Sequence, residues 1–117
     1  MDKKEIKRAY RQRVPDMGIF QIRNLVNGKV FIGRAMDLNG RLNSEKFQLK
    51  NNMHVNRDLQ GDFSELGENN FSFEVLDRLR PREVPDHDPG RELKELEDLW
   101  LEKLRPFGAA GYHAAMK

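Results

Sequence analysis

A chain of 117 residues suffices for one compact domain with a single core, but not for two domains. Hydrophobic residues make up 38% and charged residues 34%, and no apolar run approaches the roughly 18 residues of a membrane span, so we expect a soluble protein without a membrane partner. The absence of cysteine excludes disulfides and thiolate zinc sites, which fits a reducing, cytoplasmic location.

Positive charge is concentrated at the start of the chain. Residues 1–34 hold nine Lys or Arg against three Asp or Glu, and residues 35–117 hold twelve against sixteen, so the net charge of +2 divides into +6 and −4. A phosphate-binding surface would therefore draw on the first third. Residues 1–16 are predicted to form a basic amphipathic helix, with Ile6, Tyr10 and Val14 on its apolar side. This helix could pack on the remaining domain, form a homodimer or lie along nucleic acid.

Residues 18–33 are predicted to form a β-hairpin. Two runs rich in β-branched and aromatic residues flank Asn27-Gly28, a dipeptide that tolerates the positive φ values of a tight turn. Because side chains alternate across a strand, antiparallel pairing brings Phe20 and Phe31 onto the same face.

Two helices are predicted after the hairpin. The first begins after the N-cap Asp37 and ends at about residue 50, with Leu38, Leu42 and Leu49 on its buried side and Phe47 nearby. Arg41 and Glu45 lie one turn apart and could form an ion pair, which alone would make Arg41 an ordinary surface residue. The second runs from about residue 55 to the stop signal Gly67 and presents an apolar side made of Val55, Leu59, Phe63 and Leu66.

Residues 71–76 alternate with period two and predict a third strand, with Phe71, Phe73 and Val75 facing the core. Residues 80–90 contain three prolines and predict a solvated loop. We do not expect Asp86-His87-Asp88 within it to bind a metal, because adjacent loop residues rarely converge on one ion.

A last helix is predicted over residues 91–104, with Leu93, Leu96, Trp100 and Leu104 on its buried side. Glu97 falls at the border of that side, where a carboxylate normally needs a partner or a metal. Together these elements predict an α/β (α+β) sandwich, in which helices flank a small three-stranded antiparallel sheet.

The tripeptides at 18–20 and 31–33, Gly-Ile-Phe and Phe-Ile-Gly, resemble the paired motifs that name the GIY-YIG nuclease family. Phenylalanine replaces both signature tyrosines, at Phe20 and Phe31. Arg41, ten residues beyond Phe31, and Glu97, three residues before Trp100, match the arginine and the metal-binding glutamate of the family. The resemblance covers residues 17–113 and implies a GIY-YIG-like domain over residues 17–117, similar to small stand-alone bacterial members.

The resemblance implies a site in which Glu97 holds Mg²⁺ or Mn²⁺ and Arg41 clamps the scissile phosphate. Phe20 and Phe31 lack the hydroxyls that orient and deprotonate water in the family, and losing a general base costs on the order of 10² to 10⁴ in rate. His54, Tyr112 and His113 are the candidate substitutes. His54 stands where related proteins often carry a histidine, although it could equally be an exposed or capping residue, and His113 replaces the asparagine of a Gly-Tyr-Asn ending.

The first hypothesis is a metal-dependent DNA endonuclease with weakened or lost catalysis. An alternative is a non-catalytic nucleic-acid-binding module, in which Lys29, Arg34 and Arg41 contact phosphates. A third is a protein-interaction scaffold built on the first helix. The nuclease hypothesis further expects Arg41 and Glu97 to converge over the sheet face that carries the two phenylalanine rings.

Overall fold

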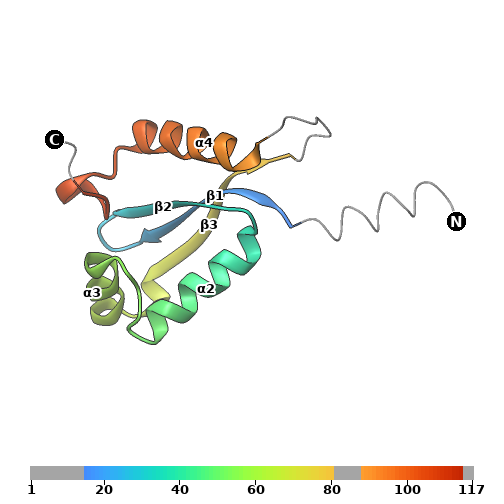
Figure 1. Cartoon of the computed structure of the whole chain (residues 1–117). Helices are drawn as coiled ribbons and strands as arrows, with labels where there is room; N and C mark the ends of the chain where they lie inside the picture. The colour runs from blue at the N-terminus through green and yellow to red at the C-terminus, as the bar shows by residue number, and fades with distance from the viewer. Residues whose placement is uncertain (1–14, 81–87, 115–117) are drawn as a thin grey trace, which may run out of the picture.

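Three strands and three helices form the part of the chain that the computed structural model describes, residues 15–80 and 88–114. In chain order they are β1 (Met17–Asn24), β2 (Val30–Ala35), α2 (Leu38–Lys50), α3 (Arg57–Leu66), β3 (Phe71–Leu79) and α4 (Pro89–Leu104), with short 3-10 turns at Glu68–Asn70 and Gly108–Ala110. The sheet has the order β2-β1-β3, and β1 is antiparallel to both neighbours (Figure 1). The predicted α+β fold is confirmed.

Strands β1 and β2 form the predicted hairpin. Gly28 has a φ of 79° in the turn, a conformation that glycine adopts at no steric cost. Phe20 pairs with Gly33 and Ile22 with Phe31, so all four point to one face of the sheet. The ring centroids of Phe20 and Phe31 lie 6.4 Å apart, which confirms that the two rings share a face.

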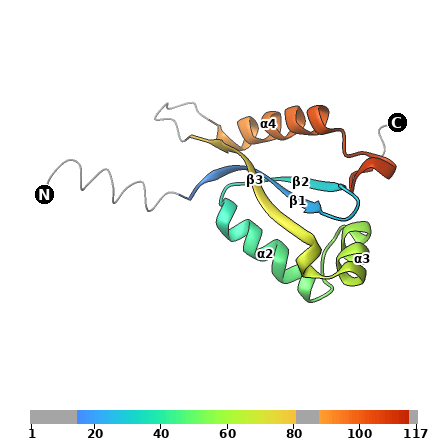
Figure 2. The ribbon, with the colours of Figure 1, turned by 180° about the vertical axis from the view of Figure 1, so that it is seen from behind.

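Helices cover both faces of the sheet, as the front and back views show (Figures 1 and 2). Helices α2 and α3 pack on the face of Phe20 and Ile22. Helix α4 packs on the other face, where the indole of Trp100 donates a hydrogen bond of 3.0 Å to Asp77, the β3 partner of Ile19. The edge strand β2 is therefore bordered by α2 on one side and by α4 on the other.

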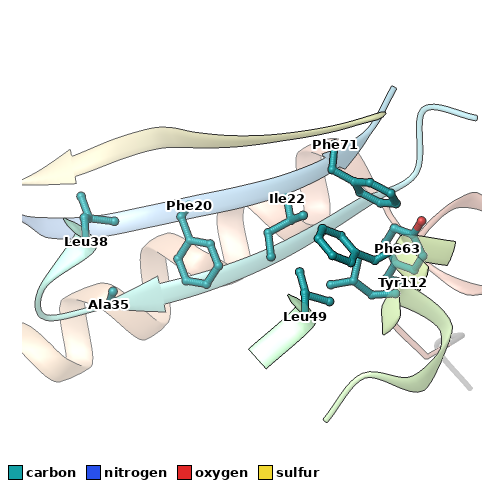
Figure 3. Packing of buried hydrophobic residues seen from close by; sticks show 9 residues of the cluster. Phe20, Ile22, Ala35, Leu38, Leu49, Phe63, Phe71 and Tyr112 are labelled. Carbon is teal, nitrogen blue, oxygen red and sulfur yellow. The ribbon is translucent and has the colours of Figure 1, made fainter. Parts of the chain in front are cut away.

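The main hydrophobic core lies between the sheet and helices α2 and α3 (Figure 3). Its buried members are Phe20, Ile22, Ala35, Leu38, Leu49, Leu59, Phe63, Phe71 and Tyr112. Phe73 and Val75 of β3 pack against this cluster, as their alternation predicts, and so does Leu42 of α2. The fold is thus held by the faces that the sequence periods indicate.

Three apolar residues differ from expectation, and one of them is Leu104, which is 41% exposed at the end of α4 although the sequence predicts it on the buried side of that helix. Val55 is 86% exposed because α3 begins only at Arg57: the side chain of Asn56 caps the helix by accepting a hydrogen bond of 3.0 Å from the Leu59 N–H. Phe47 is 62% exposed, because it does not lie on the helical face that carries Leu38 and Leu49. The predictions of burial or near-burial are wrong at all three positions.

Helix α4 begins at Pro89, two residues before the predicted start, because Asp88 caps it by accepting a hydrogen bond from the Arg91 N–H. Asp86, His87 and the predicted helix of residues 1–16 up to residue 14 lie outside the described residues. Within 15–80 and 88–114, no helix is long and apolar enough to cross a membrane. The same residues contain no group of three or more His, Asp or Glu placed to hold a metal ion.

Candidate functional site

Phe31 is the centre of a cluster of rings on strand β2. His113 stacks on its ring at a centroid distance of 5.3 Å and an interplanar angle of 4°. His54 meets the same ring edge-on at 5.4 Å, and Phe20 lies beside it. The structure therefore brings together four of the residues that the sequence singles out.

On the α2 side of this cluster, Arg41, Glu45 and His54 form a bonded chain. Arg41 Nε donates to Glu45 Oε1 at 2.8 Å, and the guanidinium lies 5.7 Å from the centre of the Phe20 ring. The other carboxylate oxygen of Glu45 is hydrogen-bonded to His54 Nε2. Burial raises the pKa of Glu45, but the hydrogen bonds from His54 and Arg41 outweigh it, and the pKa falls below its usual 4.5.

The imidazole of His54 is fully engaged. Its Nδ1 accepts a hydrogen bond of 3.0 Å from the Asn56 N–H, so in the neutral ring the proton sits on Nε2, which donates to Glu45. The side chain is only 1% exposed. His54 thus lies at the candidate site, but neither ring nitrogen is free to take a proton from water.

On the α4 side, Glu97 approaches β2 from the opposite face, whereas His113, which stacks on Phe31, lies at the outer edge of β2. Arg34 Nη1 donates to Glu97 Oε1 at 2.8 Å, and the two side chains are 45% and 14% exposed. His113 Nε2 accepts a hydrogen bond of 2.9 Å from the Ile32 N–H, which leaves the proton of the neutral ring on Nδ1. Burial lowers the pKa of His113 below 6.5, although the charge of Glu97 opposes the shift. His113 is thus a neutral hydrogen-bond donor near Glu97.

Tyr112 is a structural residue. Its hydroxyl donates to Asp62 at 2.7 Å and accepts from Asn24 Nδ2 at 3.0 Å. Burial is the main cause that raises its pKa well above 10. The predicted role as a replacement for a missing tyrosine hydroxyl does not fit a buried, doubly bonded group that keeps its proton. Instead Tyr112 fastens the C-terminal segment to the hairpin and to α3.

Arg41 and Glu97 do not converge over one face of the sheet. Their helices cover opposite faces, so the expectation of a single shared face is wrong. Arg34 links the two sides, because it binds Glu97 and also lines a pocket of about 440 Å³ with Arg41. The residues that line this pocket are Arg34, Ala35, Met36, Asp37, Gly40, Arg41, Gly90 and Leu93. The groups meet around the edge of β2 instead.

Lys29 lies apart from that pocket. Its amine is 5.9 Å from the centre of the Tyr112 ring, on the hairpin turn, and it does not line the cavity between Arg34 and Arg41. A nucleic-acid role of Lys29 would therefore involve a separate contact beyond the site.

Sequence reasoning missed the burial of Glu45, which is 2% exposed. The spacing held a signal, because Leu38, Leu42, Glu45 and Leu49 follow one another at helical intervals of four, three and four residues. A carboxylate within an apolar stripe indicates a buried partner. The part played by Asp62 had no comparable signal, since it meets Tyr112 only through the fold.

No protein-family model and no curated protein sequence matches the chain. Solved structures do. The catalytic domain of the homing endonuclease I-TevI is 28% identical, with a TM-score of 0.68, and the match covers 86% of this chain and 99% of that domain. A mutant of the catalytic domain of the same intron endonuclease is 26% identical, with a TM-score of 0.64, over 77% of this chain and 84% of that one.

Proposed function

Since the chain has the GIY-YIG fold and matches the catalytic domain of a GIY-YIG homing endonuclease over 86% of its length, we propose that it is a nuclease-like protein. Its substrate would be nucleic acid, with DNA preferred, and its catalysis would be metal-dependent and weak. The observation that carries the proposal is the meeting of Arg41, Arg34, Glu97 and His113 around β2, beside two rings without hydroxyls.

Arg41 would hold the scissile phosphate. Its side chain is 49% exposed, while the Phe20 ring and Glu45 fix its position. A guanidinium presents five donors in a planar fork, so the bond from Nε to Glu45 leaves other donors for phosphate oxygens. Charge that builds on the phosphate in the transition state would be stabilised by this fixed cation.

Glu97 would hold the divalent cation. The residues here fit a hard ion that takes oxygen ligands and keeps several waters. Glu97 offers a carboxylate, whereas His113 presents a protonated Nδ1, which donates a hydrogen bond instead of coordinating a metal. When bound, such an ion supplies Lewis acidity toward the phosphate and makes a water molecule a better nucleophile. His113 Nδ1–H would add a hydrogen bond to an oxygen of the substrate.

Removal of a proton from water is the step for which the proposed mechanism lacks a free base. Phe20 and Phe31 have no hydroxyl, His54 uses both ring nitrogens, and the Tyr112 hydroxyl is held between Asn24 and Asp62. Each candidate substitute is thus occupied or acts as a donor, which supports slow hydrolysis.

A plasmid assay tests the proposal. Purified protein is incubated with supercoiled DNA and Mg²⁺ or Mn²⁺, beside Glu97→Ala and the control Glu95→Ala, which removes an exposed carboxylate of the same helix. We expect slow nicking that Glu97→Ala abolishes and Glu95→Ala leaves intact. Equal nicking by all three proteins would indicate a contaminant and reject catalysis at Glu97. Phe31→Tyr should raise the rate, by about 100-fold if the restored hydroxyl handles the proton.

A non-catalytic binding module is the second candidate, and the engagement of His54 and Tyr112 favours it. It predicts DNA affinity without nicking, with a logarithmic salt slope of about −0.9 for each phosphate contact on duplex DNA. Lys29→Ala, Arg34→Ala and Arg41→Ala should each weaken binding and reduce the slope. Absence of binding to duplex, branched and single-stranded DNA at low salt would reject both candidates.

Two further expectations stay predictions from the sequence: a cytoplasmic location, and a homodimer through residues 1–16.

A further inference from the structure

Arg34 has two neighbourhoods within reach. On one side its Nη1 donates to Glu97 Oε1 at 2.8 Å. On the other, the same side chain lines the 440 Å³ pocket that it shares with Arg41. Arg34 is 45% exposed and Glu97 14%, so the arginine is the partner that solvent reaches. An ion pair with so exposed a member is weak and can be exchanged for another.

We propose that Arg34 exchanges between Glu97 and a nucleic-acid phosphate bound in this pocket beside Arg41. A divalent cation at Glu97 and a phosphate in the pocket therefore strengthen each other's binding. The inference rests on the proposed function, because it takes nucleic acid as the ligand and Glu97 as the cation ligand.

The lining of the pocket suits a phosphate. Two arginines line it, and bidentate contact with phosphate oxygens is the geometry that guanidinium favours. Asp37 is the acidic residue among the lining residues, but its Oδ1 accepts a hydrogen bond of 3.1 Å from the Gly40 N–H as the cap of α2. A Cβ at Gly40 would lie 2.5 Å from Asp37 Oδ2, so glycine at this position leaves room for the Asp37 cap.

The coupling follows from competition for one carboxylate. The pair with Glu97 uses only Nη1 of Arg34, but it holds the guanidinium at Glu97 and offsets its charge. A phosphate that draws Arg34 fully into the pocket must therefore break that pair. A cation at Glu97 displaces Arg34 first, so the phosphate then binds without that cost. Thermodynamic linkage makes the effect reciprocal, and bound phosphate raises cation affinity by the same factor.

Calorimetric titration with Mn²⁺ tests, without nucleic acid, whether Arg34 and a cation compete for Glu97. Arg34→Ala should bind Mn²⁺ several-fold more tightly than the unmodified protein, because the internal competitor is gone. Lys94→Ala is the matched control: it removes an exposed positive charge from the same helix as Glu97 and should leave the affinity unchanged. Equal affinity in Arg34→Ala and the unmodified protein would overturn the exchange.

Fluorescence anisotropy with labelled duplex DNA tests whether a cation tightens DNA binding through Arg34, using Ca²⁺ at matched ionic strength to avoid cleavage. We expect Ca²⁺ to tighten binding about tenfold, and Arg34→Ala to lose this gain. Persistence of the gain in Arg34→Ala would mean that the cation bridges Glu97 and the phosphate directly. That result would overturn this inference and leave the proposed function standing.

A double-mutant cycle separates release of Arg34 from simple loss of negative charge. Glu97→Gln should bind DNA more tightly without cation, and this gain should vanish in the Arg34→Ala background. A gain of equal size in both backgrounds would show charge repulsion and contradict the proposal. Inorganic phosphate is titrated separately: affinity equal to that for DNA would identify a free-anion site and also contradict it. Failure of the unmodified protein to bind DNA would overturn both proposals.

Discussion

The two sides of strand β2 hold similar charged groups in contrasting surroundings. On the α2 side, the side chain of Glu45 is 3% exposed, and its carboxylate binds both Arg41 and His54. On the α4 side, the side chain of Glu97 is 14% exposed, and its carboxylate binds an arginine whose side chain is 45% exposed. The first side is closed by its own bonds, whereas the ion pair on the second side has a member that solvent reaches.

This contrast separates residues that build the candidate site from residues that solvent reaches. A buried polar group is stable only when its bonds are satisfied, so Glu45 and His54 specify the position of Arg41 rather than meet substrate. Glu97, Arg34 and His113 are only partly buried or exposed, as the proposed contacts with an ion and a phosphate require. The family resemblance alone would have treated His54 and His113 as equals.

Breaking the closed side should have the largest effect. Glu45→Ala leaves His54 Nε2 without its acceptor and frees Arg41, and it should lower the free energy of unfolding by about 3 kcal/mol. Glu95→Ala, at a carboxylate that is 66% exposed, should stay within about 0.5 kcal/mol. Urea denaturation measures both. A loss of similar size in the two variants would show that Glu45 is an ordinary surface residue.

A change in the packing beneath Arg41 should have the second-largest effect on stability. A Cβ at Gly33 would lie 2.5 Å from Phe20 Cζ, so Gly33→Ala must displace the ring and should destabilise the fold by about 2 kcal/mol. Gly61→Ala is its control, because a Cβ there meets nothing within 4 Å and helix propensity should stabilise it by about 1 kcal/mol. Thermal melting distinguishes them. If Gly33→Ala melts at the native temperature, the close approach of strand and ring is not limiting.

Lowering the pH should destabilise the fold in two steps at different pH values, and we expect this effect on stability to be smaller than those of the substitutions above. The pKa of His113 is lowered from 6.5 by burial, so the unfolded chain takes up its proton first and stability falls as pH drops through 6.5. The pKa of Glu45 is lowered from 4.5, so its contribution is present above 4.5 and is lost as pH falls below that value.

Urea denaturation from about pH 7.5 to about pH 5 tests the first of these steps. His113→Asn should flatten the decline in stability over that range, because it removes the titrating ring. The decline should persist unchanged in Lys94→Ala, which alters an exposed charge on α4. If His113→Asn keeps the native profile, another group controls this step.

Local patterns were sufficient to predict the hairpin faces, the Asp37 cap and the buried side of α2, because strand and helix periods act over a few residues. The bond between Glu45 and His54 was not predictable, since a loop of unknown course separates them. Likewise, sequence spacing does not state which face of the sheet a later helix covers. That is why Arg41 and Glu97 were both expected above the phenylalanine rings, although α4 lies on the other face.

The hydrogen bonds of Tyr112 with Asn24 and Asp62 have a consequence for when the site can form during synthesis. Residues 112 and 113 leave the ribosome after every strand and helix described here. Tyr112 nevertheless links the hairpin to α3 through its hydrogen bonds, and His113 supplies the ring that stacks on Phe31. A nascent chain would already contain Arg41, Glu45 and Glu97 before the site is assembled. During synthesis, nucleic acid would therefore meet a protein whose candidate site is not yet assembled.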